Sequence, residues 1–357
     1  MRTPWYVGQR VLIVAPSFLA WDLGRYLEVL FRARGITCRR FAYRDFASDD
    51  EANAQLLRVA AEWSPRVVLG LKLDGIRPET IQLLRARGAL VALWYVDCFE
   101  EHVPADVAAL FPVVDVFLTT ADGMLPRYRA LAPTPAYWVY EGVYLPAFRP
   151  VALSPALRRT YASQVAFIGN LLQPPVADER LALRRFRLLE AVCRRFGLKI
   201  WGVQGDTRAR ARWPHPQCPL IEWPAFHEEV VKICQAADVV LGINTVNTVY
   251  RYFSNRTFLT LAAGGFHLTH YVPGLETMFE NRRHLVWFHD DDECLDLIAY
   301  YLPRPDARWR IAEEGRRWTR RRYGMRRQAG RILEILGAHL GAASPPADLV
   351  GARQASG

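Results

Sequence analysis

The sequence predicts an α/β protein made of two Rossmann-like halves, each with a parallel sheet wound by helices. Three observations support this prediction. Short apolar runs alternate with amphipathic stretches, a proline-rich interruption divides the alternation into two blocks, and a length of 357 residues suits about two domains. The continuous apolar run over 89–97 is typical of a strand that is buried on both faces of a parallel sheet.

The first block alternates predicted strands with predicted helices. Strands are expected over 10–15, 37–43, 66–71, 89–97, 115–120 and 136–140, and helices over 22–34, 49–63 and 78–87. Strands that are separated by helices of about 10–15 residues form βαβ units. We therefore expect a first domain over 1–148.

The alternation stops over 141–155, where three prolines and a glycine mark a linker. It then resumes, with strands expected over 164–170, 198–202, 238–244 and 284–288, and helices over 179–196, 226–236, 291–302, 305–322 and 325–340. We expect a second domain over 149–324. A helix over 325–341 is expected to pack back toward the first domain, and the small, polar end over 342–357 is expected to be disordered.

The formal net charge of +10 is carried almost entirely by arginine. These arginines are scattered without interleaved aromatic residues, so we expect no nucleic-acid partner. The one dense basic cluster, over 316–327, is interpreted as a solvated helix face, and any membrane contact is at most peripheral. Six widely spaced cysteines, with no CxxC pair, and the lack of a long apolar run favour a reduced, cytoplasmic protein.

Acidic residues that follow predicted strands are the candidate catalytic groups, because ligands of parallel sheets bind at the carboxyl ends of the strands. Asp97 ends a buried strand and is the first candidate for the base that takes a proton from an acceptor, with a loop or helix cap as the alternative. Glu141 ends the last strand of the first block and is a further candidate. Asp22 is also a candidate, although its place at the start of a helix favours a capping role.

The stretch Ser254–Thr269 places an arginine, Arg256, where a helix is expected to begin. A cation there opposes the helix dipole unless something negative lies beside it. Asn255 can cap this helix or bind a ligand oxygen, and the double glycine after it ends the helix. The pattern indicates either an anion site, suited to phosphate, or a surface charge of no consequence.

Four segments together resemble the CgeB-like glycosyltransferase family, which has the GT-B fold and is related to group 1 glycosyltransferases. They are "GVYLPAFRP" at 142–150, "FIGN" at 167–170, "NRTFLTLAAGGFHLT" at 255–269 and "AYYLPRPDARWRIAEEG" at 299–315. The resemblance implies two Rossmann-like domains that face each other across a cleft. It also implies a UDP- or GDP-type nucleotide-sugar donor on the second domain, an acceptor (a glycan, a protein or a small molecule) on the first, and no cofactor.

The resemblance also implies a set of donor-binding positions. They are Gly169 and Asn170 after the first strand of the second block, Gly202 in a further loop, Asn244 after a later strand, and Asn255 with Arg256. Two positions depart from the usual pattern, because Arg251 and Leu259 stand where many GT-B enzymes carry glutamates. This departure leaves open a degenerate GT-B protein that binds a nucleotide or glycan without turnover. A GT-B sugar-nucleotide epimerase is a third reading, and it would need no acceptor.

Two further motifs bear on metal binding. "HDDDE" at 289–293 contains neighbouring acids of the kind that bind Mg²⁺ or Mn²⁺, but it precedes a predicted helix, where capping carboxylates are expected. "HLTH" at 267–270 is not a chelate if it is a strand, because residues three apart face opposite sides. We therefore expect a metal-independent enzyme.

Overall fold

The computed structural model describes residues 4–19, 22–99, 102–169, 171, 179–202, 213–221 and 227–340. Contacts within the chain divide it into two compact units. The first unit comprises Met1–Asp97, Glu101–Glu141 and Arg326–Gly357, and the second comprises Cys98–Glu100 and Gly142–Met325. The first unit is therefore built from both the beginning and the end of the chain.

The first unit contains a six-stranded sheet in which every neighbouring pair is parallel, in the order β2-β1-β3-β4-β5-β6. The side chains of β3 and β4 are buried along their whole length, as expected for central strands with helices on both faces. The strands are β1 (Arg10–Ala15), β2 (Thr37–Ala42), β3 (Val67–Leu71), β4 (Leu90–Tyr95), β5 (Val116–Thr119) and β6 (Ala136–Trp138).

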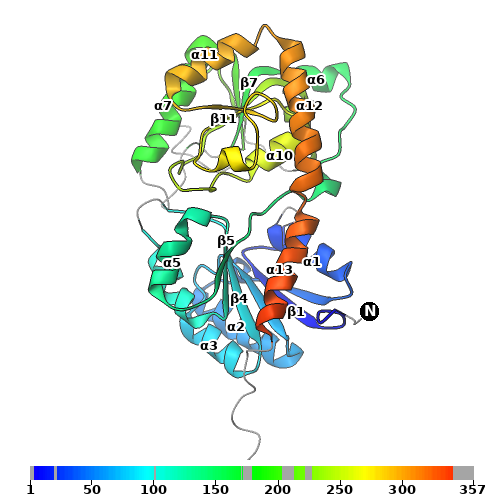
Figure 1. Cartoon of the computed structure of the whole chain (residues 1–357), viewed down its shortest axis with the longest axis vertical. Coiled ribbons are helices and arrows are strands. Elements are labelled where there is room, and N and C mark those ends of the chain that lie inside the picture. Colours follow the sequence, from blue (N-terminus) through cyan, green and yellow to red (C-terminus); the bar gives the residue numbers. More distant parts are fainter. Residues whose placement is uncertain are drawn as a thin grey trace, which may run out of the picture. The chain divides into compact units, whose positions relative to one another are not determined.

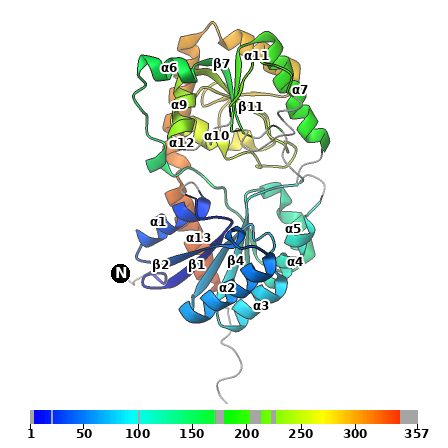
Figure 2. The ribbon, with the colours of Figure 1, turned by 180° about the vertical axis from the view of Figure 1, so that it is seen from behind.

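Helices cover both faces of this sheet. Figures 1 and 2 show α2 and α3 on one face and α1 with α13 on the other. The helices of this unit are α1 (Leu23–Arg32), α2 (Asp49–Trp63), α3 (Pro78–Ala86), α4 (Ala105–Leu110), α5 (Leu125–Leu131) and α13 (Met325–His339). Alternating strands and helices on two faces give a doubly wound fold.

Specific hydrogen bonds hold helix α13 to other parts of the first unit. The indole Nε1 of Trp5 donates to the carbonyl oxygen of Leu333 at 3.1 Å, and the hydroxyl of Tyr137 is hydrogen-bonded to Nε2 of His339 at 2.8 Å. The side chains of Ile332 and Leu336 are fully buried. The last described helix is therefore part of the core of the first unit.

The second unit contains another six-stranded parallel sheet, in the order β12-β11-β10-β7-β8-β9. Helices α7 and α11 lie on one face, and α6, α9 and α10 lie on the other, with α12 beside α10 (Figures 1 and 2). The strands are β7 (Ser163–Ile168), β8 (Leu198–Trp201), β9 (Leu220–Ile221), β10 (Ala237–Gly242), β11 (His267–His270) and β12 (Val286–Phe288). The helices are α6 (Pro155–Tyr161), α7 (Glu179–Arg195), α9 (Glu228–Ala236), α10 (Arg256–Ala263), α11 (Asp291–Tyr301) and α12 (Pro305–Arg322).

The acidic motif at 289–293 caps α11. Oδ1 of Asp290 accepts a hydrogen bond from the backbone N–H of Glu293 at 2.8 Å, and Oε2 of Glu293 accepts one from the backbone N–H of His289 at 2.7 Å. This reciprocal arrangement is a capping box, which satisfies two N–H groups at the start of a helix. The interpretation of these acids as helix caps is confirmed.

The structure differs from the expected pattern in three short helices, the short strand β9 and one covalent bond. Helices α4 and α5 lie where no helix was expected, and α6 starts at Pro155, which the sequence suggested was part of the linker. Proline is favoured in the first turn of a helix, so Pro155 begins α6 rather than ending ordered structure. Cys193 and Cys218 form a disulfide, which differs from the reduced chain expected from cysteine spacing alone.

The basic cluster over 316–327 falls largely on α12, where its arginines make contacts within the second unit. Arg316 and Arg317 both pair with Glu313, with N–O distances of 2.7 Å. The guanidinium of Arg322 lies over the ring of Trp318, 4.0 Å from its centroid. Several of these arginines thus form ion pairs on the surface of α12 or pack against an aromatic ring. Among the described residues, no helix combines the length and the apolar character needed to cross a bilayer.

Candidate functional site

The strand order places two loops of the second unit at a topological switch point. β7 and β10 are neighbours in the sheet. After β7 the chain continues to β8 on one side, and after β10 it continues to β11 on the other side. Crevices at the carboxyl ends of such strands are the usual ligand sites of open α/β sheets. The loop after β7 begins with Gly169, and the loop after β10 contains Asn244, so two of the predicted donor-binding residues lie at this point.

Gly169 and Arg256 lie against each other. A Cβ atom on Gly169 would come within 2.8 Å of Nη1 of Arg256, and Gly169 has a φ of 145°, which favours glycine. The backbone N–H of Gly169 donates to the carbonyl of Trp201 at 2.8 Å, which fixes this turn at the end of the sheet. The structure therefore brings together two residues that are far apart in the sequence and were both predicted to bind the donor.

Arg256 is the first residue of α10, as the sequence predicted, but Ser254 makes the local hydrogen bonds. Its hydroxyl accepts from the N–H of Arg256 at 3.3 Å, and its carbonyl accepts from the N–H of Thr257 at 3.0 Å. The side chain of Asn255 makes no capping hydrogen bond. Because two of the first N–H groups already have partners, an anion at this helix end would depend mainly on the guanidinium of Arg256.

Arg185 is a second cation at this place that sequence reasoning missed. It lies on α7, its residue surface is only 3% exposed, and a guanidinium nitrogen donates to the hydroxyl of Thr245. Burial, and then the nearby charge of Arg256, lower the pKa of Arg185 to about 9, so it stays protonated at neutral pH. Nothing in the sequence distinguishes it from Arg184 and Arg187, because only tertiary packing shows which arginine of an amphipathic helix is buried.

The two guanidinium groups make this region suited to an anion. Like charges disfavour each other at short range and more strongly where water is excluded, so a bound anion would relieve the repulsion between Arg185 and Arg256. Asn244 contributes a further donor. Its Oδ1 accepts from the N–H of Ser254 at 2.9 Å, while its Nδ2 is buried and has no hydrogen-bond partner among the described residues. This buried amide is therefore available to donate to an oxygen of a ligand.

A neutral histidine is hydrogen-bonded to the first turn of α10. His267, on β11, is buried, and its Nδ1–H donates to the carbonyl of Val240 at 3.1 Å, so Nε2 is left to accept from the hydroxyl of Thr257 at 3.2 Å. Burial is the main cause that lowers the pKa of His267 to about 4. The other histidine of this strand, His270, bonds instead to Asn247 and His289. The two histidines of "HLTH" therefore have separate partners and form no chelate.

Three of the remaining predicted donor positions lie within the described residues. Nε of Arg251 donates to the hydroxyl of Thr277 at 2.9 Å, and its backbone has a φ of 52°. Leu259 is half-buried on α10, three residues after Arg256. Gly202 follows β8 and donates to the carbonyl of Ile221 at 3.1 Å. Asn170 lies outside the described residues.

In the first unit, Asp97 forms an ion pair that the sequence did not predict. It follows β4 and lies 2.5 Å from Nζ of Lys72, which follows β3, and both side chains are about one-third exposed, at 35% and 28%. Lys72 and the next residue, Leu73, have φ values of 63° and 66°. Two successive non-glycine residues in this left-handed region are uncommon and cluster at functional sites. The loop after β3 thus holds a lysine against the candidate base.

Other polar groups surround this pair at the same edge of the sheet. Arg44 pairs with Asp74. Burial acts to lower the pKa of Arg44, but the hydrogen bond to Asp74 and the nearby charges, including that of Asp97, raise it above its ordinary value. Burial, and then the charge of Asp97, raise the pKa of Tyr95 above its ordinary value, so this phenol remains neutral. The carboxylate of Asp97 therefore lies in a polar cluster that is accessible to solvent, which suits a group that exchanges protons with a ligand.

One of the two other acidic candidates has a structural role. Oδ1 of Asp22 accepts from the N–H of Gly24 at 2.6 Å and Oδ2 accepts from the hydroxyl of Ser17 at 2.9 Å, so the expected capping role at α1 is confirmed. Glu141 is half-buried, and it is the last residue of the segment Glu101–Glu141 of the first unit. Among the described residues, no group of three or more His, Cys, Asp or Glu side chains is arranged to hold a metal ion.

Comparison with known proteins relates the second unit to sugar transfer. Residues 184–334 match the model of a family described as glycosyl transferase-like. This segment includes Arg185, Asn244 and Arg256. No curated protein matches the chain in sequence.

Several solved structures share the fold over almost the whole chain. The Anabaena protein HepE, solved with UDP and glucose, has a TM-score of 0.63 at 12% identity, covering 92% of this chain and 100% of that one. Sucrose-phosphate synthase from Thermosynechococcus elongatus has a TM-score of 0.68 at 14% identity, covering 94% and 100%. A glycosyltransferase from Rickettsia africae has a TM-score of 0.68 at 10% identity, covering 94% and 99%. The fold is therefore GT-B, α/β with two Rossmann-like units, and residues 184–334 are similar to the glycosyl transferase-like family.

Proposed function

We propose that the chain transfers a sugar from a nucleotide diphosphate to an acceptor without a metal ion, as a relative of the CgeB-like glycosyltransferases. The observation that carries this proposal is the cluster at the switch point of the second unit, where Arg185 and Arg256 lie together beside Gly169. Two guanidinium groups match the charge and geometry of a diphosphate. Asn244 offers a further donor to the same ligand.

The donor and the acceptor are assigned to different units in this proposal. The second unit would hold the nucleotide diphosphate, and the first would supply Asp97 as the base that removes the proton of the acceptor hydroxyl. The ammonium group of Lys72, 2.5 Å from Asp97, holds the carboxylate in position. The nucleotide of HepE is UDP, which supports a UDP-sugar as the first donor to test, with GDP-sugars second.

The proposal is tested by binding and turnover measured side by side. Calorimetry with UDP and GDP reports whether a nucleoside diphosphate binds, and release of that diphosphate from a panel of UDP- and GDP-sugars, with mixed acceptors, reports transfer. We expect one nucleotide to bind and one of its sugars to be consumed. If neither nucleotide binds, the assignment of the switch-point cluster is wrong.

A second reading is a GT-B protein that binds a nucleotide without turnover. It is favoured by Arg251 and Leu259 at the positions where many GT-B enzymes carry glutamates. Arg251 bonds to Thr277, and Leu259 has no group that can accept a hydrogen bond from a sugar. Under this reading the nucleotide binds, but no donor is consumed with any acceptor, which the same two measurements distinguish.

Transfer activity is expected to persist in excess EDTA. The two arginines can balance the charge of the diphosphate, and two of the acids of "HDDDE", Asp290 and Glu293, are engaged in capping α11. The measurement is the initial rate of diphosphate release with and without EDTA, after dialysis against the chelator. Complete loss of activity that Mn²⁺ or Mg²⁺ restores would show that a metal ion, and not the arginines, supports the leaving group.

A further inference from the structure

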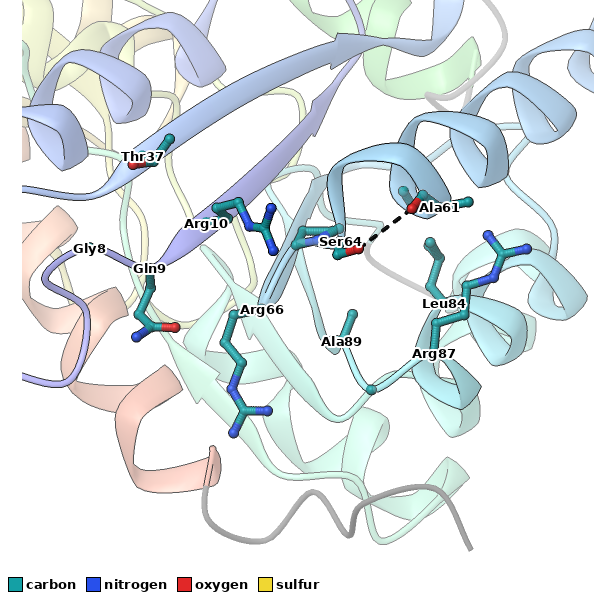
Figure 3. Close-up of a pocket in the computed structure, with 13 residues that line it drawn as sticks. Gly8, Gln9, Arg10, Thr37, Ala61, Ser64, Arg66, Leu84, Arg87 and Ala89 are labelled. Carbon is teal, nitrogen blue, oxygen red and sulfur yellow. Dashed lines mark hydrogen bonds between the residues drawn. The ribbon is translucent and has the colours of Figure 1, made fainter. Parts of the chain in front are cut away.

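A depression of about 830 Å³ lies at the amino ends of the strands in the first unit (Figure 3). Its lining comes from the starts of β1 and β2, the segments leading into β3 and β4, and the ends of α2 and α3. Asp97 and Lys72 follow the carboxyl ends of β4 and β3, so the depression is at the opposite edge of the sheet from the candidate base. Its size is within the range of small-molecule sites.

Three arginines, Arg10, Arg66 and Arg87, line the depression, and no acidic residue is among its lining residues. Within the part of the chain that the structure describes, none of the three forms an ion pair with a carboxylate. By contrast, Arg85 on α3 pairs with Asp115 at 2.8 Å. Hydroxyl groups of Thr37 and Ser64 add polar character to the lining. The depression is therefore strongly cationic.

Two of these guanidinium groups also donate to backbone carbonyls. Nη1 of Arg87 donates to the carbonyl of Leu57, in the middle of α2, at 2.6 Å. Arg10 begins β1, and Arg66 directly precedes β3. Nη2 of Arg66 donates to the carbonyl of Leu340, which directly follows α13, at 3.4 Å. A carbonyl carries no net charge, so these contacts leave the positive charges of the depression uncompensated by any carboxylate of the described residues.

The sheet also holds two of the arginines side by side. The N–H of Arg66 donates to the carbonyl of Arg10 at 2.9 Å, which extends by one residue the ladder that pairs Val11 with Val67. Neighbouring strands are about 4.8 Å apart, and like charges at opposed positions destabilise a sheet. An anion with several charges that reaches both side chains would offset these like charges on neighbouring strands.

We propose that this depression binds a small soluble anion with two or more phosphate groups, through Arg10, Arg66 and Arg87. Planar guanidinium groups form paired hydrogen bonds with phosphate oxygens, and several of them around one hollow favour a ligand with more than one phosphate. The site is separate from the switch-point cluster of the second unit, and it does not depend on the proposed transfer reaction.

The test uses inorganic pyrophosphate and calorimetry at low ionic strength on the full chain. All variants carry Arg256→Ala, so that binding at the second unit is weakened in every sample. The double change Arg10→Gln and Arg66→Gln should weaken binding about tenfold or more, since hydrogen bonds between charged groups are among the strong ones. The matched control is Arg127→Gln with Arg129→Gln on α5, which removes the same charge from the same unit and should leave the affinity within about twofold.

Two results would overturn the proposal. One is equal pyrophosphate affinity in the Arg10 and Arg66 variant and in the control. The other is a lack of pyrophosphate binding together with attachment to vesicles that contain anionic phospholipid, if that attachment is lost in the double variant and absent with phosphatidylcholine alone. Thermal melting checks that each variant folds. If the double variant does not fold, Arg10→Gln alone replaces it, since no hydrogen bond from the side chain of Arg10 is found within the described residues.

Discussion

Replacement of Asp97 by asparagine is expected to lower turnover about 100-fold or more, the usual contribution of a positioned general base. Asparagine keeps the shape of the side chain but cannot take up a proton. Binding of the donor should change little, because the residues proposed to hold it belong to the second unit. The effect should therefore appear in kcat at saturating acceptor and donor, and not in the affinity for the nucleoside diphosphate.

The control for this prediction is Asp45→Asn. Asp45 is an exposed carboxylate in the same unit, in the segment that follows β2, so the change removes the same charge near the same edge of the sheet. Steady-state rates and calorimetric affinities for both variants separate chemistry from binding. Equal turnover in the Asp97 variant and the control would remove Asp97 from the mechanism and leave its pair with Lys72 as a structural bond.

Replacement of Arg256 by alanine is expected to weaken binding of the nucleoside diphosphate by about 1.5–3 kcal/mol, the usual scale for a hydrogen bond to a charged group. The loss should be partial, because the buried Arg185 remains. Calorimetry with the nucleotide identified for the wild type measures it. Arg317→Ala, an exposed arginine of α12 in the same unit, is the control for lost charge and should bind as the wild type does.

A companion measurement uses the 2′-deoxy form of the same nucleotide. Leu259 lies three residues after Arg256, on the same face of α10, and cannot accept a hydrogen bond from a ribose hydroxyl. The deoxy form should therefore bind nearly as well as the ribonucleotide. Wild-type affinity in the Arg256 variant would make this arginine a surface charge without function. Much weaker binding of the deoxy form would show that another residue reads the ribose.

The fold could be predicted largely because buried parallel strands appear in the sequence as continuous apolar runs. β4 is apolar at every position, since helices cover both of its faces, and the capping acids of α11 mark its start. The short helix α6 was not foreseen because a proline can mark either a linker or the first turn of a helix, and Pro155 is in a first turn. The proximity of Gly169 and Arg256 was implied by family resemblance, and packing then placed one against the other.

The parts of the site that could not be predicted depend on contacts between distant residues. Lys72 and Asp97 follow different strands, and no pattern in the sequence links them. Arg185 sits in a helix with several arginines, and its burial is decided by how α7 packs against β7 and β10. The roles proposed for Asp97, Arg185 and Arg256 remain predictions for the experiments described above.

The position of α13 has a consequence for how the protein is made. The ribosome completes the entire second unit, up to Met325, before it synthesises the helix whose Ile332 and Leu336 fill the core of the first. The core of the first unit therefore cannot be completed, and Trp5 lacks its partner Leu333, until almost all of the remaining chain has been translated. Such a nascent first unit exposes apolar surface for longer than a contiguous domain would, which makes it a natural client for chaperones that bind unfinished chains.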